Sequence, residues 1–326
     1  MATKERVLEV KDLELHYFTR KGVVRAVDKI SFDLRQGETL GVVGESGCGK
    51  TTMATALLNM PTPPGRIVGG QILVDGLDTL KMSEQEIRRR VRWETIAMVF
   101  QGAMNCLTPV YTIKKQMKET LQQHREMTRQ EMDARMRKYL NLVGLSDDVL
   151  RRYPHELSGG MKQRVVIAMA LFLEPKVVIC DEPTTALDVV VQAQIINLLK
   201  ELKDQLQVSF IFITHDLSIE AEVSDRIMVM YAGRIAELGT NEQIYGPQGP
   251  AHPYTQRLLA ATPRLHEELE ELAFIPGTPP DLLEPPPGCR FHPRCHVVME
   301  RCAKDEVPLR QIEPDHQAAC WRCFHE

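Results

Sequence analysis

The sequence predicts an α/β sandwich with a helical insert, followed by an irregular C-terminal region. Two continuous apolar runs, VVICDEP (177–183) and SFIFITHD (209–216), are typical of strands buried on both faces of a parallel sheet. A helical segment at 189–206 separates them, and strand–helix–strand order is typical of α/β proteins. The irregular region is marked by proline, because 13 of the 20 prolines follow Tyr245 and proline interrupts both helices and sheets.

The first 75 residues predict short strands in VLEVKDLELHYF, TLGVVG and QILVDG. A helix is expected from Lys50 to Asn59, directly after a glycine-rich loop. From about 83 to 173 the pattern is mostly helical, with IAMVFQ (96–101) as a strand within it. Helical spacing at 128–145 places four apolar residues on one face: Met132, Met136, Leu140 and Val143.

After Tyr245 we expect extended backbone with one helix at 254–261 and another through HEELEEL (266–272). The predicted division is therefore a domain at 1–244, with a helical subdomain at about 102–172, and an accessory region at 245–326.

Composition excludes several classes of protein. The 326 residues carry a net charge of −4, which gives no basic surface for nucleic acid. No apolar run is long enough to cross a bilayer, and the start lacks the apolar core of a signal peptide. We therefore expect an intracellular protein without nucleic-acid partners. Five of the eight cysteines crowd the last 40 residues, which in such a protein suggests a metal site before disulfides.

The segment Gly44-Glu45-Ser46-Gly47-Cys48-Gly49-Lys50-Thr51 fits the phosphate-loop pattern and follows an apolar strand. Its glycines let backbone N–H groups surround phosphate oxygens, and the helix that follows adds a favourable dipole. We expect Lys50 to contact the β- and γ-phosphates and Thr51 to bind Mg²⁺. The loop predicts a P-loop NTPase core, and an ordinary glycine turn is the alternative. Cys48 is either an oxidation-sensitive residue or a small side chain that the loop tolerates.

Asp181 and Glu182 end the apolar strand VVIC, so they face the ligand crevice of a parallel sheet. We expect Asp181 to hold Mg²⁺ and Glu182 to act as general base toward the attacking water. A pair of solvated acids at a strand end is the alternative.

The segment LSGGMKQR (157–164) opens a further helix. Ser158 can cap that helix, and Gly159 and Gly160 keep its amides accessible, so its start is a second anion site. A plain helix cap is the alternative. Because the chain already has one complete phosphate loop, this second site implies ATP shared between two subunits.

These motifs together resemble the ATP-binding subunits of ABC transporters, over about residues 5–240. The resemblance implies a RecA-like core with an antiparallel β subdomain and a helical subdomain. It implies that His215 contacts the γ-phosphate, that Gln101 senses Mg²⁺ and water, and that Asp188 lies in a loop reaching the partner subunit. Tyr17 is the candidate for stacking on adenine, although a strand aromatic is also often core. The implied nucleotide contacts are Tyr17, Gly44, Ser46, Gly47, Cys48, Gly49, Lys50, Thr51, Thr52, Gln101 and Asp181, with Ser158, Gly159, Gly160 and Asp188 acting on the partner's ATP.

Segments 251–263, 288–302 and 100–109 resemble the ATP-binding subunits of dipeptide and oligopeptide permeases. Gly102 and Ala103 depart from that group's commoner Asp-Pro, and Met161 replaces a frequent glutamine. The resemblance implies two permease subunits, a second, non-identical ATP-binding subunit, an external binding protein and a peripheral position on the cytoplasmic membrane face. The expected cargo is peptides; nickel or oligosaccharide import, and a soluble ABC ATPase without transport, are the alternatives.

Cys289, Cys295, Cys302 and Cys320, with Cys323 as a substitute, could hold a [4Fe–4S] cluster or zinc. Their spacing favours neither, and reduced thiols without a ligand are a third interpretation. The resemblance favours the iron–sulfur cluster, in a structural role or as a redox-responsive module.

Overall fold

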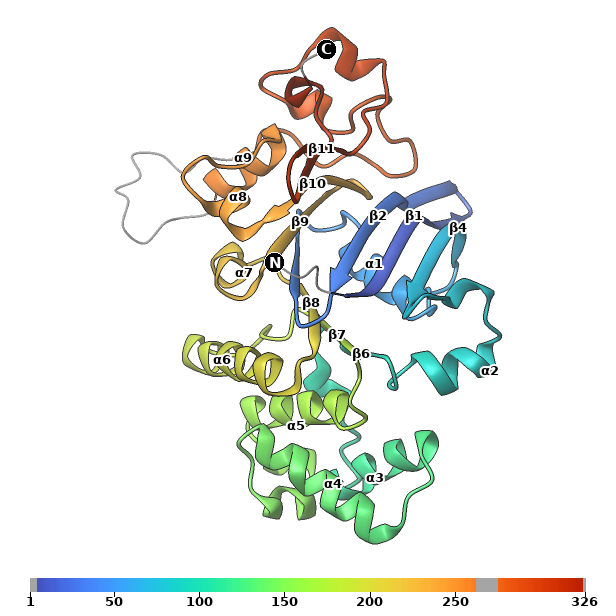
Figure 1. The fold of residues 1–326 in the computed structure, drawn as a ribbon, viewed down its shortest axis with the longest axis vertical. Helices are drawn as coiled ribbons and strands as arrows, with labels where there is room; N and C mark the ends of the chain where they lie inside the picture. Colours follow the sequence, from blue (N-terminus) through green and yellow to red (C-terminus); the bar gives the residue numbers. More distant parts are fainter. Residues whose placement is uncertain (1–4, 262–274, 325–326) are drawn as a thin grey trace. The chain divides into compact units, whose positions relative to one another are not determined.

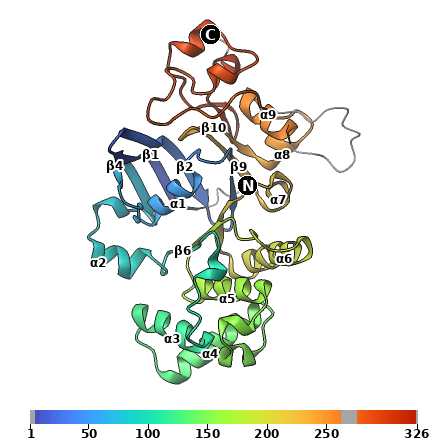
Figure 2. The same cartoon turned by 180° about the vertical axis from the view of Figure 1, so that it is seen from behind.

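The computed structural model describes residues 5–261 and 275–324, which form two compact units (Figure 1, Figure 2). The first unit comprises residues 5–8, 34–38 and 74–212. The second comprises residues 9–33, 39–73, 213–261 and 275–324. Both units contain strands and helices, as the predicted α/β class requires. The segment HEELEEL, predicted as a helix, lies outside the described residues.

The first unit holds parallel strands and a group of helices. Its strands are β5 (Leu77–Asp78), β6 (Ile96–Val99), β7 (Val177–Asp181) and β8 (Ser209–Ile213, of which the last residue falls in the second unit). Its helices are α2 (Glu84–Glu86), α3 (Ile113–His124), α4 (Arg129–Leu142), α5 (Gly159–Leu171) and α6 (Val189–Leu206). The strand order is β8-β7-β6, with β6 and β7 parallel. The sequence predictions for β7, β8 and α6 are confirmed.

Helices α3, α4 and α5 lie together (green in Figure 1). Thr128 begins α4 with a capping box, in which its side chain accepts from the Glu131 N–H and the Glu131 carboxylate accepts from the Thr128 N–H. The apolar face predicted for this helix is confirmed, because all four of its residues are buried: Met132, Met136, Leu140 and Val143.

The second unit contains most residues of β1 (Arg6–Thr19), β2 (Gly22–Arg35) and β4 (Gly65–Val74), which lie in the order β2-β1-β4. Its other strands are β3 (Thr39–Val43), β9 (Arg226–Tyr231), β10 (Arg234–Thr240), β11 (Arg310–Glu313) and β12 (His316–Ala318), in the order β11-β12-β10-β9-β3. Its helices are α1 (Lys50–Leu57), α7 (Leu217–Val223), α8 (Asn241–Tyr245) and α9 (Pro253–Ala260). Strands β3 and β9 are parallel, and β9, β10 and β12 are antiparallel neighbours.

The C-terminal residues pack on this second unit. Helix α9, predicted at 254–261, is confirmed and lies beside β10 in both views (Figure 1, Figure 2). Strand β12 pairs with β10, where the buried Glu237 carboxylate accepts from the Ala251 N–H at 2.6 Å and lies 2.8 Å from His316 Nε2. Tyr254 and Phe291 are fully buried in one apolar cluster with residues of β3 and β9. The proline-rich region therefore has short elements, as predicted, yet it shares a core with strands β3 and β9.

Candidate functional site

The glycine-rich loop between β3 and α1 has a backbone that only glycine adopts without strain. The φ angles of Gly44, Gly47 and Gly49 are 146°, 79° and 107°. A Cβ atom at Gly44 would overlap the carbonyl oxygen of Met230, and one at Gly49 would overlap that of Ala26. A Cβ at Gly47 would meet nothing within 4 Å. The loop is therefore packed closely on one side and open on the other.

Lys50 is enclosed by this loop. Its Nζ donates to the carbonyl oxygens of Gly44 at 2.7 Å and Glu45 at 3.1 Å. Helix α1 begins at Lys50, and its N-cap, Gly49, supplies no side-chain hydrogen bond to the first turn. The Thr51 side chain, next along the helix, is exposed. An ammonium group, helix amides and an open side together suit phosphate oxygens.

Tyr17 lies close to the first turn of α1, and Cys48 is part of the loop itself. The Tyr17 hydroxyl lies 3.3 Å from Thr52 Oγ1, in the first turn of α1, whereas Phe18 is exposed with the Arg66 guanidinium over its ring. Of these two neighbouring aromatic residues, Tyr17 is the one in contact with α1, and its adenine contact stays a prediction. Cys48 is buried, and burial raises the pKa of its thiol, so the reactive thiolate is disfavoured. This favours the interpretation of Cys48 as a tolerated small residue.

The structure brings together two residues predicted for catalysis, Gln101 and Glu182. Gln101 Nε2 donates to Glu182 Oε2 at 2.7 Å, and Thr185 Oγ1 donates to the same oxygen at 2.9 Å. Glu182 has a φ of 47°, an uncommon value for a residue with a side chain and one that occurs preferentially at functional sites. Asp181, which ends β7, is buried. Thr185 is not among the residues predicted from the sequence. Its position, three residues after Glu182, is the only feature of the sequence that could have indicated a contact with that carboxylate.

Ser158 caps helix α5, as predicted, by accepting from the Met161 N–H at 3.3 Å. Asp188 caps α6 in the same way, because its Oδ1 accepts from the Val191 N–H at 2.9 Å. The two helix starts are neighbours, because a Cβ at Gly160 would lie 2.7 Å from Val191 Cγ1. Ser158 and Asp188 are exposed, and so are the first two residues of α6, Val189 and Val190. The starts of α5 and α6 are therefore exposed.

The predicted residues divide between the two units. Tyr17, the phosphate loop and His215 belong to the second unit; Gln101, the pair Asp181 and Glu182, Ser158 and Asp188 belong to the first. His215 follows β8 and is exposed, directly before Asp216, which caps α7.

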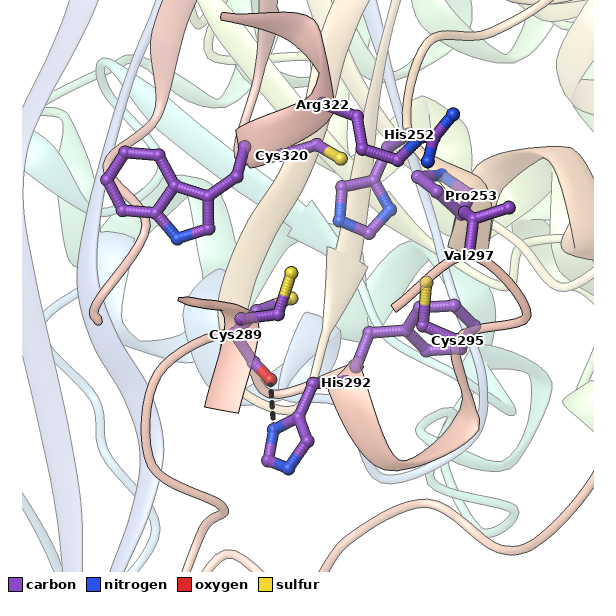
Figure 3. A pocket seen from close by; sticks show the side chains of 11 residues that line it. His252, Pro253, Cys289, His292, Cys295, Val297, Cys320 and Arg322 are labelled. Carbon is purple, nitrogen blue, oxygen red and sulfur yellow. Dashed lines mark hydrogen bonds between the residues drawn. The ribbon is translucent and has the colours of Figure 1, made fainter. Parts of the chain in front are cut away.

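Four of the tail cysteines line one cavity, in which the side chains of Cys289, Cys295 and Cys320 turn toward a common space (Figure 3). Cys302 lines the same cavity. Cys323 is outside the lining, and its Sγ lies 3.7 Å from the Ala251 carbonyl oxygen. Much of the remaining lining is apolar or aromatic: Pro253, Phe291, Val297 and Trp321.

The distances among the cysteine sulfur atoms limit which metal group these residues could hold. Among the described residues, no three cysteine sulfurs lie within 4.8 Å of one another. Tetrahedral zinc needs sulfurs about 3.8 Å apart, because each Zn–S bond is about 2.3 Å. An iron–sulfur cluster is larger, since each cysteine binds a different iron. No three cysteine sulfurs among the described residues therefore have the mutual spacing of one tetrahedral zinc site.

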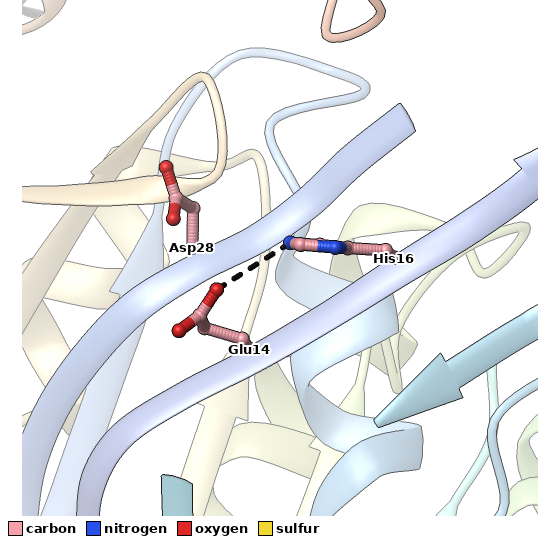
Figure 4. Close-up of side chains that lie close together, drawn as sticks. All are labelled: Glu14, His16 and Asp28. Carbon is pink, nitrogen blue, oxygen red and sulfur yellow. Dashed lines mark ion pairs between the residues drawn. The ribbon is translucent and has the colours of Figure 1, made fainter. Parts of the chain in front are cut away.

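In the described part of the chain, one group meets the distance expected of metal ligands: Glu14, His16 and Asp28 (Figure 4). The Asp28 carboxylate, however, is bonded to the guanidinium groups of Arg290 and Arg234. Burial would raise the pKa of Asp28, but these two cations outweigh it and lower the pKa. The charge that would attract a cation is thus already neutralised.

Two residues of the C-terminal region, Arg294 and Tyr254, contact the phosphate loop at Glu45. The Arg294 guanidinium bonds both carboxylate oxygens of Glu45, at 2.6 and 2.9 Å, and the Glu45 N–H donates to the Tyr254 hydroxyl at 2.9 Å. Sequence reasoning missed this contact, because residues about 200 and 250 positions apart carry no pattern that links them.

Comparison with known proteins identifies the family. A family model described as ABC transporter matches residues 27–185, and one described as the C-terminal region of oligopeptide/dipeptide transporters matches residues 236–302. The dipeptide transport ATP-binding protein DppD of Bacillus subtilis (strain 168) is 45% identical, over 97% of this chain and 95% of its own length. The chain belongs to the ABC transporter family. The oligopeptide transport ATP-binding protein OppD of Escherichia coli (strain K12) is 44% identical, over 99% and 95% of the two chains.

Solved structures agree with this ABC assignment. The dimeric ATP-binding cassette MJ0796, bound to ADP and Pi, has a TM-score of 0.63 and 26% identity over 72% of this chain and 98% of its own. The cbiO1 protein from Clostridium perfringens, part of the cbiONQ transporter complex, has a TM-score of 0.66 and 28% identity over 75% and 92%. These likenesses confirm the predicted ABC ATPase fold. Of the helices in the described ranges, none combines the length and the apolar character that a bilayer crossing requires.

Proposed function

We propose that this chain is the ATP-hydrolysing subunit of an ABC importer for dipeptides or oligopeptides. The support is the likeness to dipeptide and oligopeptide transport ATP-binding proteins along nearly the whole chain, including its C-terminal region. We take residues 1–244 as the nucleotide-binding domain, with a helical subdomain at about 102–172, and 245–326 as an accessory region. The match of the oligopeptide/dipeptide model to residues 236–302 supports this division.

ATP binds at the phosphate loop in this proposal. Lys50 contacts the β- and γ-phosphates, while the backbone amides of the loop donate to phosphate oxygens. Thr51 and Asp181 hold Mg²⁺, which neutralises charge on the phosphates when it is bound. Tyr17 stacks on the adenine, and the place of its hydroxyl beside α1 supports this role.

Glu182 is the proposed general base. It takes a proton from the water whose oxygen attacks the γ-phosphorus, and ADP leaves with the electron pair of the broken P–O bond. Gln101 and Thr185 hold the Glu182 carboxylate through the hydrogen bonds described above. His215 aligns the water and the γ-phosphate from the end of β8.

Hydrolysis requires a second ATP-binding subunit in this proposal. Ser158, Gly159, Gly160 and Asp188 complete the ATP site of the partner, and the exposure of Ser158 and Asp188 supports this. The partners are a second, non-identical ATP-binding subunit and two permease subunits, with an external binding protein acting through the permease. The chain would lie on the cytoplasmic face of the membrane.

We propose that Cys289, Cys295, Cys302 and Cys320 hold a [4Fe–4S] cluster that cross-links the C-terminal segments. Two observations support the cluster over zinc: the four cysteines share one cavity, and no three cysteine sulfurs of the described residues are as close together as one zinc ion requires. Protein purified without oxygen should contain about four irons per chain and absorb visible light. Stoichiometric zinc, or a colourless and iron-free protein, would contradict the cluster. Cys323→Ser should keep the iron, because its sulfur lies outside the cavity lining.

Nucleotide binding and membrane recruitment test the motor role. The wild-type chain should bind MgATP, and Lys50→Ala should lose most of that affinity because it removes the cation that meets the phosphates. Co-expression with the permease subunits should move the chain to the membrane fraction. A chain that stays in the supernatant with the permease present would instead support a soluble ABC ATPase.

A further inference from the structure

The side chain of Glu45 places a negative charge in the loop that binds a polyanion. Its carboxylate is about one quarter exposed and makes a two-pronged ion pair with Arg294. Paired N–H···O bonds between guanidinium and carboxylate fix orientation as well as distance. The Glu45 backbone N–H is separately bound by the Tyr254 hydroxyl. Both the side chain and the backbone at this loop position are thus held by the C-terminal region.

The Arg294 side chain also has contacts outside the phosphate loop. Its side chain is 5% exposed, and its Nε donates to the Pro276 carbonyl oxygen at 2.8 Å. Its guanidinium lies 3.3 Å from the Tyr231 hydroxyl. The rings of Tyr231, Tyr254 and Phe291 pack against one another, with centroids 4.5 to 5.3 Å apart. Arg294 is therefore held by partners other than Glu45, through the Pro276 carbonyl oxygen and the Tyr231 hydroxyl.

The charge balance explains why the loop needs this support. Without Arg294, the Glu45 carboxylate would be an unpaired negative charge in the loop proposed to bind phosphates, and like charges oppose binding. With Arg294 present, the carboxylate is neutralised and held by two hydrogen bonds. Glu45 also fits the loop geometry, since the Lys50 amine bonds its carbonyl oxygen at 3.1 Å.

We propose that Arg294 is a positioning residue for the phosphate loop, through which the C-terminal region sets the affinity for ATP by neutralising and orienting Glu45. The inference rests on the proposed ATP site. Its consequence is that the accessory region does more than add stability: nucleotide affinity depends on its docking.

Titration of the full-length chain with MgATP tests this, in a Glu182→Gln background that prevents turnover. Arg294→Gln should raise Kd about tenfold, because it leaves a bare carboxylate in the loop. Adding Glu45→Gln should return Kd to within about threefold of the parent, because the uncompensated charge is gone. Lys304→Gln, which removes an exposed cation of the same region, should leave Kd unchanged.

The rescue distinguishes positioning from general destabilisation. An Arg294→Gln chain that binds like the parent would overturn the proposal, and so would a raised Kd that Glu45→Gln does not relieve. If Arg294→Gln fails to fold, Arg294→Lys takes its place: it keeps the charge, loses the two-pronged geometry, and should show a smaller rise that Glu45→Gln again relieves. A parent chain that does not bind MgATP at all would instead refute the proposed function.

Discussion

Replacing Glu182 by glutamine removes the proposed base while leaving the shape of the site almost unchanged. Placed at the position of Glu182 Oε2, the amide oxygen can still accept from both Thr185 Oγ1, 2.9 Å from that oxygen in the wild type, and Gln101 Nε2, 2.7 Å from it. The substitution therefore separates loss of the base from loss of structure. A general base contributes about 10²- to 10⁴-fold to a rate, or about 3 to 5.5 kcal/mol of the barrier.

Phosphate release by the reconstituted transporter measures this effect. We expect kcat to fall at least 100-fold, while MgATP binding is retained because Lys50 and the loop amides are untouched. Glu300→Gln, which removes an exposed carboxylate of the C-terminal region, should hydrolyse ATP like the wild type. Hydrolysis by Glu182→Gln within about threefold of the wild type would show that another group accepts the proton, and the role given to Glu182 would be wrong.

Two further predictions concern stability and its coupling to activity. Ser158→Ala removes the α5 cap and should lower the free energy of unfolding by about 1 kcal/mol. Thr128→Ala removes the α4 cap and should lower it by a similar amount. Only Ser158→Ala should also lower ATPase activity in the assembled transporter. Arg290→Met removes one of the two guanidinium groups paired with Asp28 and should cost about 1–3 kcal/mol of unfolding free energy, measured by urea denaturation at pH 7. Because the folded-state pKa of Asp28 lies below its unfolded value of about 3.9, this stabilisation is present above about pH 4 and is lost as pH falls through the folded pKa. The difference between wild type and Arg290→Met should therefore shrink in acid, and a constant difference would exclude Asp28 as its source.

The elements that sequence predicted best are those with a local cause. Strands β7 and β8 are continuous apolar runs, and the helix predicted between them has the bounds of α6. In the structure, Asp188 caps the start of α6 and Gln207 follows its end in a left-handed conformation. The phosphate loop was equally clear, because its glycines answer a backbone requirement visible in their φ values. The motifs and their spacing therefore predicted most of the residues proposed to bind the nucleotide.

The parts that sequence could not predict depend on contacts between distant segments. Strand β12 joins β10, and its three residues are too few to show a periodic pattern. The ion pair of Glu45 with Arg294 joins residues whose local sequences say nothing of each other. Sequence spacing likewise does not decide whether Cys320 or Cys323 is the fourth proposed cluster ligand. That depends on which side chain lines the cavity, and Cys320 does.

Peptide uptake into sealed vesicles tests the central claim most directly. The complex of this chain with its permease, partner ATPase and binding protein should accumulate a labelled dipeptide or oligopeptide when ATP is supplied on the side of this chain. The same complex carrying Glu182→Gln should bind ATP without accumulating peptide. ATP-dependent uptake of nickel or an oligosaccharide with no peptide uptake, or peptide uptake that persists without hydrolysis, would contradict the account.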